Sequence, residues 1–224
     1  MTTNWYHITT GQFGYPQPEN DFGYINKTYD SSNACLTCNI GLRQKDEFRF
    51  RSEPKAQHSQ FLGLNWVFDQ VFVRQSVKDV FEQEGITGIE FSQPVINKTG
   101  LPIGGLYQLR VDSLLSNGLL TDNLKSEVCE RPKDKSMFKF LQANKSKLAE
   151  GPFCGQTKFN FPQVDNCIKL KGEALDNKTD IVRLDYYFGS GGSANRPIII
   201  SDRVKQIIDR EKWRGAFLQQ IELV

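Results

Sequence analysis

Two stretches of this chain repeat one pattern of apolar triplet, amphipathic segment and glycine. They are VFVRQSVKDVFEQEGITG, residues 71–88, and IIISDRVKQIIDREKWRG, residues 198–215. They align at an offset of 127 residues (198 − 71), which matches the triplets, a lysine, a glutamate and the last glycine. Such triplets suit buried strands. A chain with the same unit twice has to bury two similar apolar faces.

The middle of each stretch predicts a helix with one buried stripe, because its apolar residues recur at i, i+3 and i+4. The aligned residues of this stripe are Val77, Val80 and Phe81 in the first stretch and Val204, Ile207 and Ile208 in the second. Ser76 and Ser201 lie near the expected helix starts, where a hydroxyl can accept a hydrogen bond from a backbone N–H. The glycines then lead into the short strands IEF and AFLQQIEL.

Two further matches lie upstream in the same order. LNWVF, residues 64–68, matches LDYYF, residues 184–188, at an offset of 120 (184 − 64), and CLTCN, residues 35–39, can be laid over GPFCG, residues 151–155, at 116 (151 − 35). The offset grows along the chain, and the last increase falls in the polar loop GSGGSAN, where insertions are tolerated. The ordered set predicts an internal repeat; the alternative is that strand–helix–strand units resemble each other without a common origin.

We therefore expect an α+β (mixed α/β) fold of two pseudo-repeated halves, each with a strand–helix–strand unit packed on a β-sheet. Residues 1–112 form the first half, with the CxxC knuckle, and residues 137–224 form the second half, with a degenerate knuckle. Residues 113–136 are interpreted as a connector because their end, NLKSEVCERPKDKS, is polar and charged. CIKLK, residues 167–171, is a further strand candidate, and the halves are expected to form one compact unit.

Composition favours a folded protein without bulk attraction to nucleic acid or membranes. Hydrophobic residues make up 38% of the 224 residues, which is enough for a core, and 28 basic against 26 acidic residues leave a net charge of +2. No apolar run is long enough to span a bilayer, and the start, MTTNWYHITTGQFG, lacks the features of a secretory signal. We expect a cytoplasmic protein whose five cysteines are thiols or metal ligands rather than disulfides.

The cysteines predict a zinc site. Cys35 and Cys38 have the spacing that places two sulfurs on one tetrahedral ion, and Asn39 suits the turn that follows. The second copy has Cys154 but Gly151 in place of the first thiol, and Cys129 could supply the missing ligand. The hypothesis is a structural zinc ion held by Cys35, Cys38, Cys129 and Cys154, with Cys167 as a spare thiol. The alternatives are thiols that are merely buried and a redox pair, which is disfavoured because the preceding YDSSNA predicts a loop.

Other chemistry is sparse. His7 and His58 are interpreted as surface residues, and neither G-x-S-x-G nor H-E-x-x-H occurs. GSGGSAN, residues 189–195, could cradle a phosphate, but without a following Gly-Lys-Ser/Thr it is predicted to be a flexible or partner-contacting loop. FRFR, residues 48–51, predicts a half-buried strand with a basic outer face in preference to a surface for single-stranded nucleic acid.

The sequence resembles the double-CXXCG motif proteins of bacteria. The likeness rests on Cys35 and Cys38, on residues 151–155 and on residues 190–215; the chain departs from the family at Asn39, where the family has glycine, and at Gly151, where it has cysteine. Members are described as immunity proteins, which neutralise a cognate toxin delivered between competing bacteria. The resemblance implies a non-enzymatic binding protein with a toxin as its partner.

Two other function classes remain open. A zinc-ribbon-like nucleic-acid-binding protein would use Cys35, Cys38 and the FRFR strand, and its binding would depend on salt. An enzyme would have its site between the two halves, where Arg183, Asp185 and Tyr186 are the first candidates.

Overall fold

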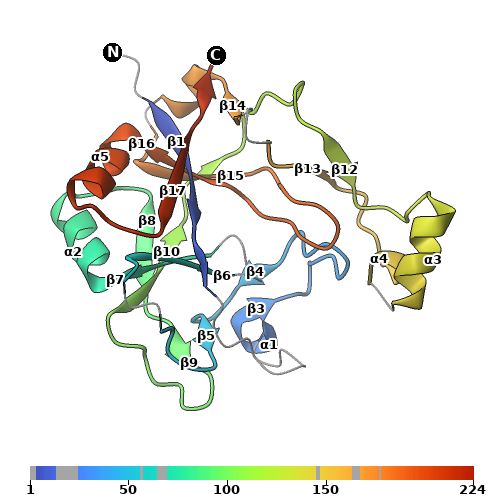
Figure 1. Cartoon of the computed structure of the whole chain (residues 1–224), viewed down its shortest axis with the longest axis horizontal. Coiled ribbons are helices and arrows are strands. Elements are labelled where there is room, and N and C mark those ends of the chain that lie inside the picture. The colour runs from blue at the N-terminus through green and yellow to red at the C-terminus, as the bar shows by residue number, and fades with distance from the viewer. Residues whose placement is uncertain are drawn as a thin grey trace.

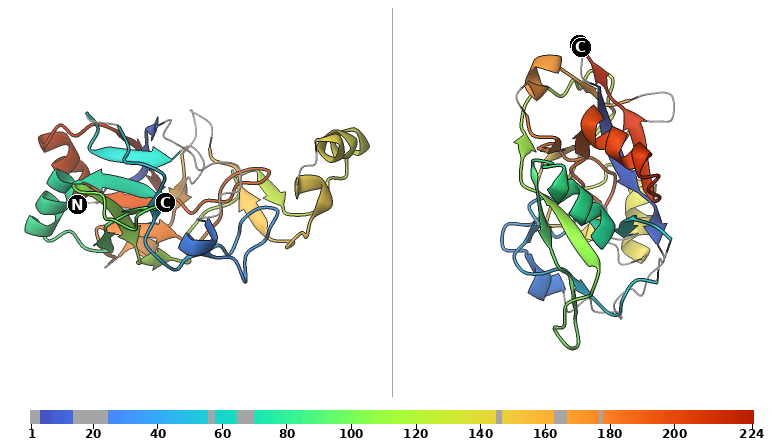
Figure 2. Two further views of the ribbon diagram at one scale, coloured as in Figure 1. Left: turned by 90° about the horizontal axis from the view of Figure 1, so that it is seen from below. Right: turned by 90° about the vertical axis from the view of Figure 1, so that its left-hand side faces the viewer.

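The structure is a computed structural model that describes residues 4–13, 25–55, 58–64, 70–144, 147–162, 167–176 and 178–224. Within these ranges it is an α+β fold dominated by two five-stranded sheets, with two nine-residue helices, α2 and α5, that lie side by side (Figures 1 and 2). The prediction of a mixed α/β fold is confirmed. None of the helices in the described part of the chain is both long enough and apolar enough to cross a membrane.

The first sheet, sheet A, contains mainly strands from the C-terminal part of the chain. Its order is β11-β15-β16-β1-β17, and all pairs are antiparallel except β11 with β15. The strands are β1 (Trp5–Thr10), β11 (Leu114–Leu115), β15 (Ile181–Leu184), β16 (Ile198–Ser201) and β17 (Ala216–Gln220).

The second sheet, sheet B, has the same pattern of pairings. Its order is β2-β6-β7-β10-β8, and only β2 with β6 is parallel. The strands are β2 (Gln12–Phe13), β6 (Phe61–Leu64), β7 (Val71–Arg74), β8 (Ile89–Ser92) and β10 (Leu106–Val111).

The two sheets exchange strands. β1, at the start of the chain, lies between β16 and β17 in sheet A, and the chain then crosses to sheet B as β2. β10 lies between β7 and β8 in sheet B, and the chain then crosses to sheet A as β11. In each sheet the fourth strand in the order, β1 or β10, is followed along the chain by a strand of the other sheet.

The two predicted strand–helix units occur where the sequence places them. β7 runs into α2 (Gln75–Gln83) and β16 runs into α5 (Asp202–Arg210). The expected stripes face the core: Val77, Phe81, Val204, Ile207 and Ile208 are buried, and Val80 is partly buried. The expected serine caps are wrong, because neither helix has a side-chain cap; the hydroxyl of Ser201 instead donates to Asp180, at 3.2 Å.

The glycines after the helices contact the opposite sheet. Gly88 and Gly215 have φ of +89° and +91°, and a Cβ there would lie 2.1 Å from the Ile181 oxygen and 2.2 Å from the Phe61 oxygen, respectively. The neighbouring hydrogen bonds correspond as well: Ile181 N–H donates to Thr87 O and Phe61 N–H donates to Arg214 O, both at 3.1 Å. Sheet A and sheet B are therefore joined by two equivalent contacts.

The core has three main layers. The largest lies between the two sheets and the helices, with Ile8, Phe61, Val77 and Ile200 among its members. Smaller clusters cover the other face of sheet A, around Trp5, and the other face of sheet B, around Phe72.

The remaining elements are short, and several of them build the periphery. They are α1 (Ile25–Thr28), β3 (Tyr29–Asp30), β4 (Arg43–Gln44), β5 (Arg49–Phe50), β9 (Val95–Ile96), β12 (Ser126–Val128), α3 (Lys135–Ala143), α4 (Lys147–Glu150), β13 (Thr157–Phe159), β14 (Lys169–Leu170), the 3-10 helix η1 (Gly172–Leu175) and β18 (Glu222–Leu223). β12 pairs with β13, and α3 and α4 project from the body beyond this hairpin (Figures 1 and 2).

Three sequence expectations fall in these peripheral regions. The predicted connector, residues 113–136, contains two strands, β11 and β12, and the CIKLK candidate contains β14. The LNWVF match lies almost entirely outside the described residues, which leave out residues 65–69.

Candidate metal centre

Cys35 and Cys38 lie in a tight turn between β3 and β4. The N–H of Cys35 donates to Ile40 O, at 2.8 Å, and the N–H of Asn39 donates to Cys35 O, at 2.8 Å. Asn39 has φ of 63°, a conformation that asparagine tolerates better than most residues. The turn does not follow a long strand or start a helix, so the chain lacks the setting expected of a thioredoxin-like redox pair.

Cys129 and Cys154 lie in a second turn of the same kind, between β12 and β13. The N–H of Cys129 donates to Gln156 O, at 2.9 Å, and the N–H of Gly155 donates to Cys129 O, at 3.0 Å. Gly155 has φ of 70°. Cys129 therefore takes the place that the sequence alignment assigned to Gly151, and that part of the alignment is wrong.

The four thiols meet in one cluster. Their sulfurs all lie within 4.8 Å of one another, with Cys35 Sγ 3.8 Å from Cys129 Sγ and Cys38 Sγ 3.7 Å from Cys154 Sγ. Four thiolates at about 2.3 Å from a tetrahedral zinc ion would be separated by roughly 3.8 Å. Cys35, Cys38 and Cys129 are buried and Cys154 is exposed. The donor set fits zinc.

Cys167 is not part of the cluster. It is a partly buried free thiol whose sulfur lies 3.9 Å from Glu222 Oε2, just before β14. This placement agrees with its interpretation as a spare thiol at the start of a strand.

Backbone amides point at the sulfurs. Burial raises the pKa of Cys35, but the N–H groups of Cys38 and Thr37 donate to its sulfur and bring the pKa down to about 6. Burial raises the pKa of Cys38, against an opposing N–H contact from Ile40. Amides aimed at sulfur stabilise a thiolate, the form that binds a metal ion.

An apolar shell and a glycine-rich loop enclose the cluster. Ile40 is buried beside the thiols, with Phe153, Tyr187 and Ala194 packed against them. The Thr37 hydroxyl donates to Pro152 O at 2.7 Å and joins the two turns. The shell restricts the access of water to the three buried thiols, Cys35, Cys38 and Cys129, as expected of a structural rather than a catalytic metal site.

The loop GSGGSAN, residues 189–195, is held by a buried lysine. Lys158 Nζ donates to the carbonyl oxygens of Gly191, at 2.6 Å, and Ser193, at 3.3 Å, and lies 3.5 Å from Glu127 Oε1. The Gly191 N–H donates to the same carboxylate oxygen, at 3.1 Å. This amide therefore binds an internal carboxylate rather than a phosphate, and sequence reasoning missed Lys158 because a lone lysine in a short strand carries no burial signal.

The basic FRFR segment has its aromatic rings inside the protein. Phe48 and Phe50 are buried against Phe72 with ring centroids 4.9 and 5.0 Å away, and Arg49 pairs with Asp46 at 2.8 Å. The predicted alternation of buried rings with more exposed arginines is confirmed, but the strand itself, β5, spans only Arg49–Phe50. The rings are not exposed for stacking on bases, which removes the specific observation that favoured a nucleic-acid-binding function.

His7 is not a surface residue, contrary to expectation. Its side chain is buried in the middle of sheet A and stacks on Phe161 at 5.7 Å between ring centroids, and desolvation lowers its pKa to about 4. His58 is exposed, as predicted. Four successive residues of β1, Trp5 to Ile8, are buried, because sheet A is covered on both faces.

The residues suggested for an enzyme do not form one titratable cluster. Arg183 is buried within β15, whereas Asp185 is exposed and pairs with Arg196 at 3.3 Å. The Tyr186 hydroxyl donates to the Ser116 carbonyl oxygen, at 3.1 Å.

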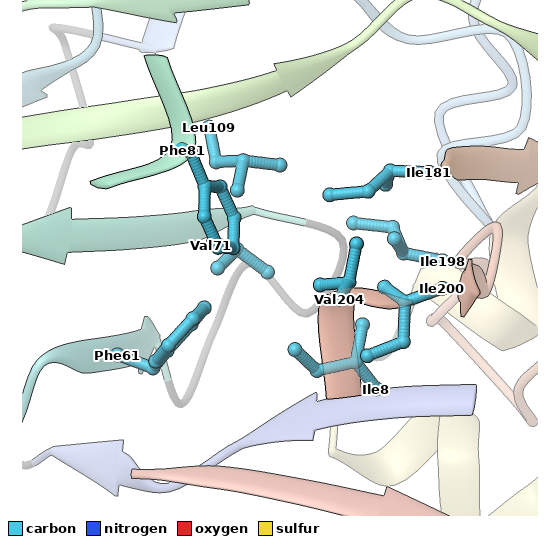
Figure 3. Close-up of a pocket in the computed structure, with 9 residues that line it drawn as sticks. All are labelled: Ile8, Phe61, Val71, Phe81, Leu109, Ile181, Ile198, Ile200 and Val204. Carbon is cyan, nitrogen blue, oxygen red and sulfur yellow. The ribbon is translucent and has the colours of Figure 1, made fainter. Parts of the chain in front are cut away.

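The space between the two sheets is a packing gap. It measures about 10 Å³ and is lined by nine apolar side chains, which come from the two sheets and from helices α2 and α5 and face one another in Figure 3. This is about the space of one water molecule, and the lining offers no polar side chain to hold one. The gap is too small for a substrate.

Comparisons with known proteins do not assign the chain. No family model matches its sequence, and no curated protein matches it.

Proposed function

We propose that the protein is a non-enzymatic, zinc-stabilised binding protein of the immunity type, which neutralises a cognate bacterial toxin in the cytoplasm. The observation that carries the proposal is the meeting of two cysteine turns in one four-sulfur cluster. Paired turns of this kind are the feature by which the sequence resembles the double-CXXCG proteins. The toxin as partner comes from that resemblance alone.

The metal would be structural. Four cysteines complete a tetrahedral shell, so no coordination position is left for water or substrate. The ligands come from segments far apart in the chain, and the ion would hold the β3–β4 turn against the β12–β13 turn. Because such a site forms only in the folded chain, metal binding would contribute directly to stability.

Metal analysis of untagged protein tests this part. We expect one zinc ion per chain, and we expect a strong chelator to lower the unfolding temperature. Cys38→Ser should lose zinc, whereas Cys167→Ser should retain it. Substoichiometric zinc together with five titratable thiols in the folded protein would refute the zinc site.

Protection from a toxin tests the binding function. The gene is co-expressed with the product of its neighbouring gene in a sensitive strain, and the two proteins are purified together. We expect survival of the cells and a stable complex. A folded, zinc-loaded protein that neither protects the cells nor binds the neighbouring product would show that the immunity proposal is wrong.

We also infer that the chain contains two copies of one module, β1 to β8 and β10 to β17, whose first strands, β1 and β10, have been exchanged between the two sheets. Reciprocal contacts support this: the N–H of Gln75 donates to Gly105 O at 3.1 Å, and the N–H of Asp202 donates to Asn4 O at 3.0 Å. Lys78 lies over the Tyr107 ring, with 5.4 Å from Nζ to the centroid. In the same way, Lys205 lies over the Tyr6 ring, at 5.6 Å.

A further inference from the structure

We propose that Cys129 and Cys154 are the two cysteines of a single C-x-x-C knuckle, opened by an insertion of residues 130–151 that forms an arm. The arm, named here for those residues, includes α3 and α4. The inference rests on the zinc site of the proposed function. Beyond that site, the inference states which cysteines form each knuckle. It also states that the metal centre does not need the arm.

The hydrogen bonds of the two turns identify the equivalent positions. The first cysteine of each turn donates its N–H to a carbonyl just beyond the second cysteine, Ile40 O for Cys35 and Gln156 O for Cys129. Its carbonyl accepts from the residue after the second cysteine, Asn39 or Gly155. Since Cys35 and Cys129 make the same two bonds, Cys129 is the first cysteine of the second knuckle.

Backbone conformation and flanking strands agree with this equivalence. Asn39 and Gly155 both have positive φ, 63° and 70°. The first turn joins the antiparallel pair β3–β4, and the second joins the antiparallel pair β12–β13. Leu36 and Thr37 thus correspond to Pro152 and Phe153.

Without residues 130–151, the sequence contains a contiguous C-x-x-C motif. Cys129 would be followed directly by Pro152, Phe153, Cys154 and Gly155, which reads C-P-F-C-G. A repeat search cannot find this motif, because the insertion leaves Gly151 at the position where the first cysteine is sought.

In the described part of the arm, several contacts join near neighbours. Lys133 pairs with Glu130 at 2.8 Å, the Ser136 hydroxyl donates to Asp134, and the Asn144 side chain donates to Phe140 O. α3 packs on α4, and the Phe140 side chain is 65% exposed. Figure 1 and the left view of Figure 2 show α3 and α4 projecting away from the two sheets.

The position of the insertion means that a bound metal ion would also hold the base of the arm. The arm leaves the knuckle immediately after one ligand, Cys129, and returns shortly before another, Cys154. A bound ion therefore fixes both ends of the arm, while the arm itself supplies no ligand. The arm is an added element, placed on a rigid base beside the metal centre.

Two shortened chains test the inference. The first lacks residues 130–151, so that Cys129 joins Pro152. The second keeps Glu130 and Gly151 and replaces residues 131–150 with Gly-Ser-Gly, which avoids strain at the junction. The probe is zinc alone, measured by metal content and by competition with a chromophoric chelator, and the unfolding temperature is recorded with and without zinc.

We expect at least one shortened chain to bind one zinc ion, with an affinity within about threefold of the full chain. Its unfolding temperature should stay within a few degrees of the full chain's, and Cys129→Ser in the same background should abolish zinc binding. Loss of zinc or of folding in both shortened chains, while the full chain retains both, would overturn the inference. If the full chain binds no zinc, the proposed zinc site fails. The inference is then judged by the unfolding temperatures of the metal-free chains, and a large drop in both shortened chains overturns it.

Discussion

Lys158 shows how one residue can set the position of a loop. Its side chain is fully buried, and its ammonium group binds the carbonyl oxygens of Gly191 and Ser193 beside the Glu127 carboxylate. The loop it holds lies against the first cysteine turn, where the Asn39 side chain donates to Gly192 O at 3.4 Å. Removing the ammonium group would leave two partly buried carbonyl oxygens without their donor, which is costly.

We expect Lys158→Met to lower the free energy of unfolding by about 2–3 kcal/mol, because the carbonyl oxygens of Gly191 and Ser193 lose the donor that holds the loop. Urea titration of the zinc-loaded protein measures this. Lys169→Met is the control: Lys169 pairs with Glu222 at 2.7 Å but is partly exposed, so its loss should cost clearly less than the loss of Lys158. Equal losses in the two variants would contradict the role given to Lys158.

His7 predicts a pH dependence of stability. Desolvation lowers its pKa from 6.5 to about 4 in the folded protein, so between these values the unfolded chain binds the proton and the folded chain does not. The stability that depends on neutral His7 is therefore fully present above pH 6.5 and is lost as the pH falls toward 4. The difference in pKa corresponds to a loss of about 3 kcal/mol.

His7→Gln should remove this part of the acid slope, because glutamine does not titrate; Gln108 occupies the corresponding position of β10 in sheet B and is likewise buried. Unfolding free energies at intervals between pH 6.5 and 4.5 measure the slope. His58→Gln, at an exposed position, should leave it unchanged. A His7→Gln slope equal to that of the original chain would show that another group controls acid stability.

At the residue scale, sequence reasoning worked where the residue type limits the chemistry. The spacing of Cys35 and Cys38 predicted one metal-binding turn, and the two cysteines added to complete the site, Cys129 and Cys154, do lie beside it. Sequence reasoning did not predict burial of His7 or Lys158, because burial of a polar residue depends on contacts far away in the chain, such as Phe161 on His7 and the 189–195 loop on Lys158.

At the element scale, the two glycines after the helices join the sheets. Gly88 and Gly215 combine positive φ with close approach to a carbonyl oxygen of the opposite sheet. Either feature alone disfavours a side chain. Together they leave no place for a Cβ unless β15 or β6 moves.

We expect Gly88→Ala and Gly215→Ala each to lower the free energy of unfolding by at least about 2 kcal/mol, because strain and a steric clash add. Gly100→Ala is the matched control, since Gly100 has φ of +71° but open space around it. Gly100→Ala should lower the free energy of unfolding by about 1 kcal/mol, because only the left-handed backbone conformation opposes the new side chain. Thermal unfolding of the three variants measures the difference. Similar losses in all three would show that the backbone at Ile181 and Phe61 moves away from the new Cβ at little cost.

The elements themselves were predictable where periodicity was strong. The stripes of α2 and α5 and the triplets of β7 and β16 follow from apolar spacing. The second cysteine knuckle did not follow, because its two cysteines are separated by a helical arm and only the hydrogen bonds of Cys129 with Gly155 and Gln156 reveal their relation.

At the scale of the whole molecule, strand exchange was beyond sequence reasoning. Similar units in one chain predict similar structures, but local patterns do not specify which strand inserts into which sheet. β1 pairs with strands near the other end of the chain, Tyr6 opposite Ile200 on one side and Gln220 on the other. Pairings this distant in sequence are set by tertiary packing.

Strand exchange predicts that the two sheets unfold together. Opening sheet A releases β1 and β11, which continue directly into β2 and β10 of sheet B, so neither sheet can open without pulling strands from the other. The shared core strengthens this coupling, because Ile8 of β1 and Leu109 of β10 are both buried in the cluster between the sheets. The most protected amides of β1 and β10 should therefore exchange with the same opening free energy, within about 1 kcal/mol.

Ile8→Ala and Leu109→Ala form a matched pair for this test, since they occupy corresponding positions in the central antiparallel ladders of sheets A and B. Each should cost about 2–4 kcal/mol. Hydrogen exchange followed by mass spectrometry reports both sheets at once. In a single cooperative unit, each variant lowers protection equally in β1 and β10. A variant that lowers protection only in its own sheet would show that the sheets open independently, and the strand exchange would then not couple the two halves.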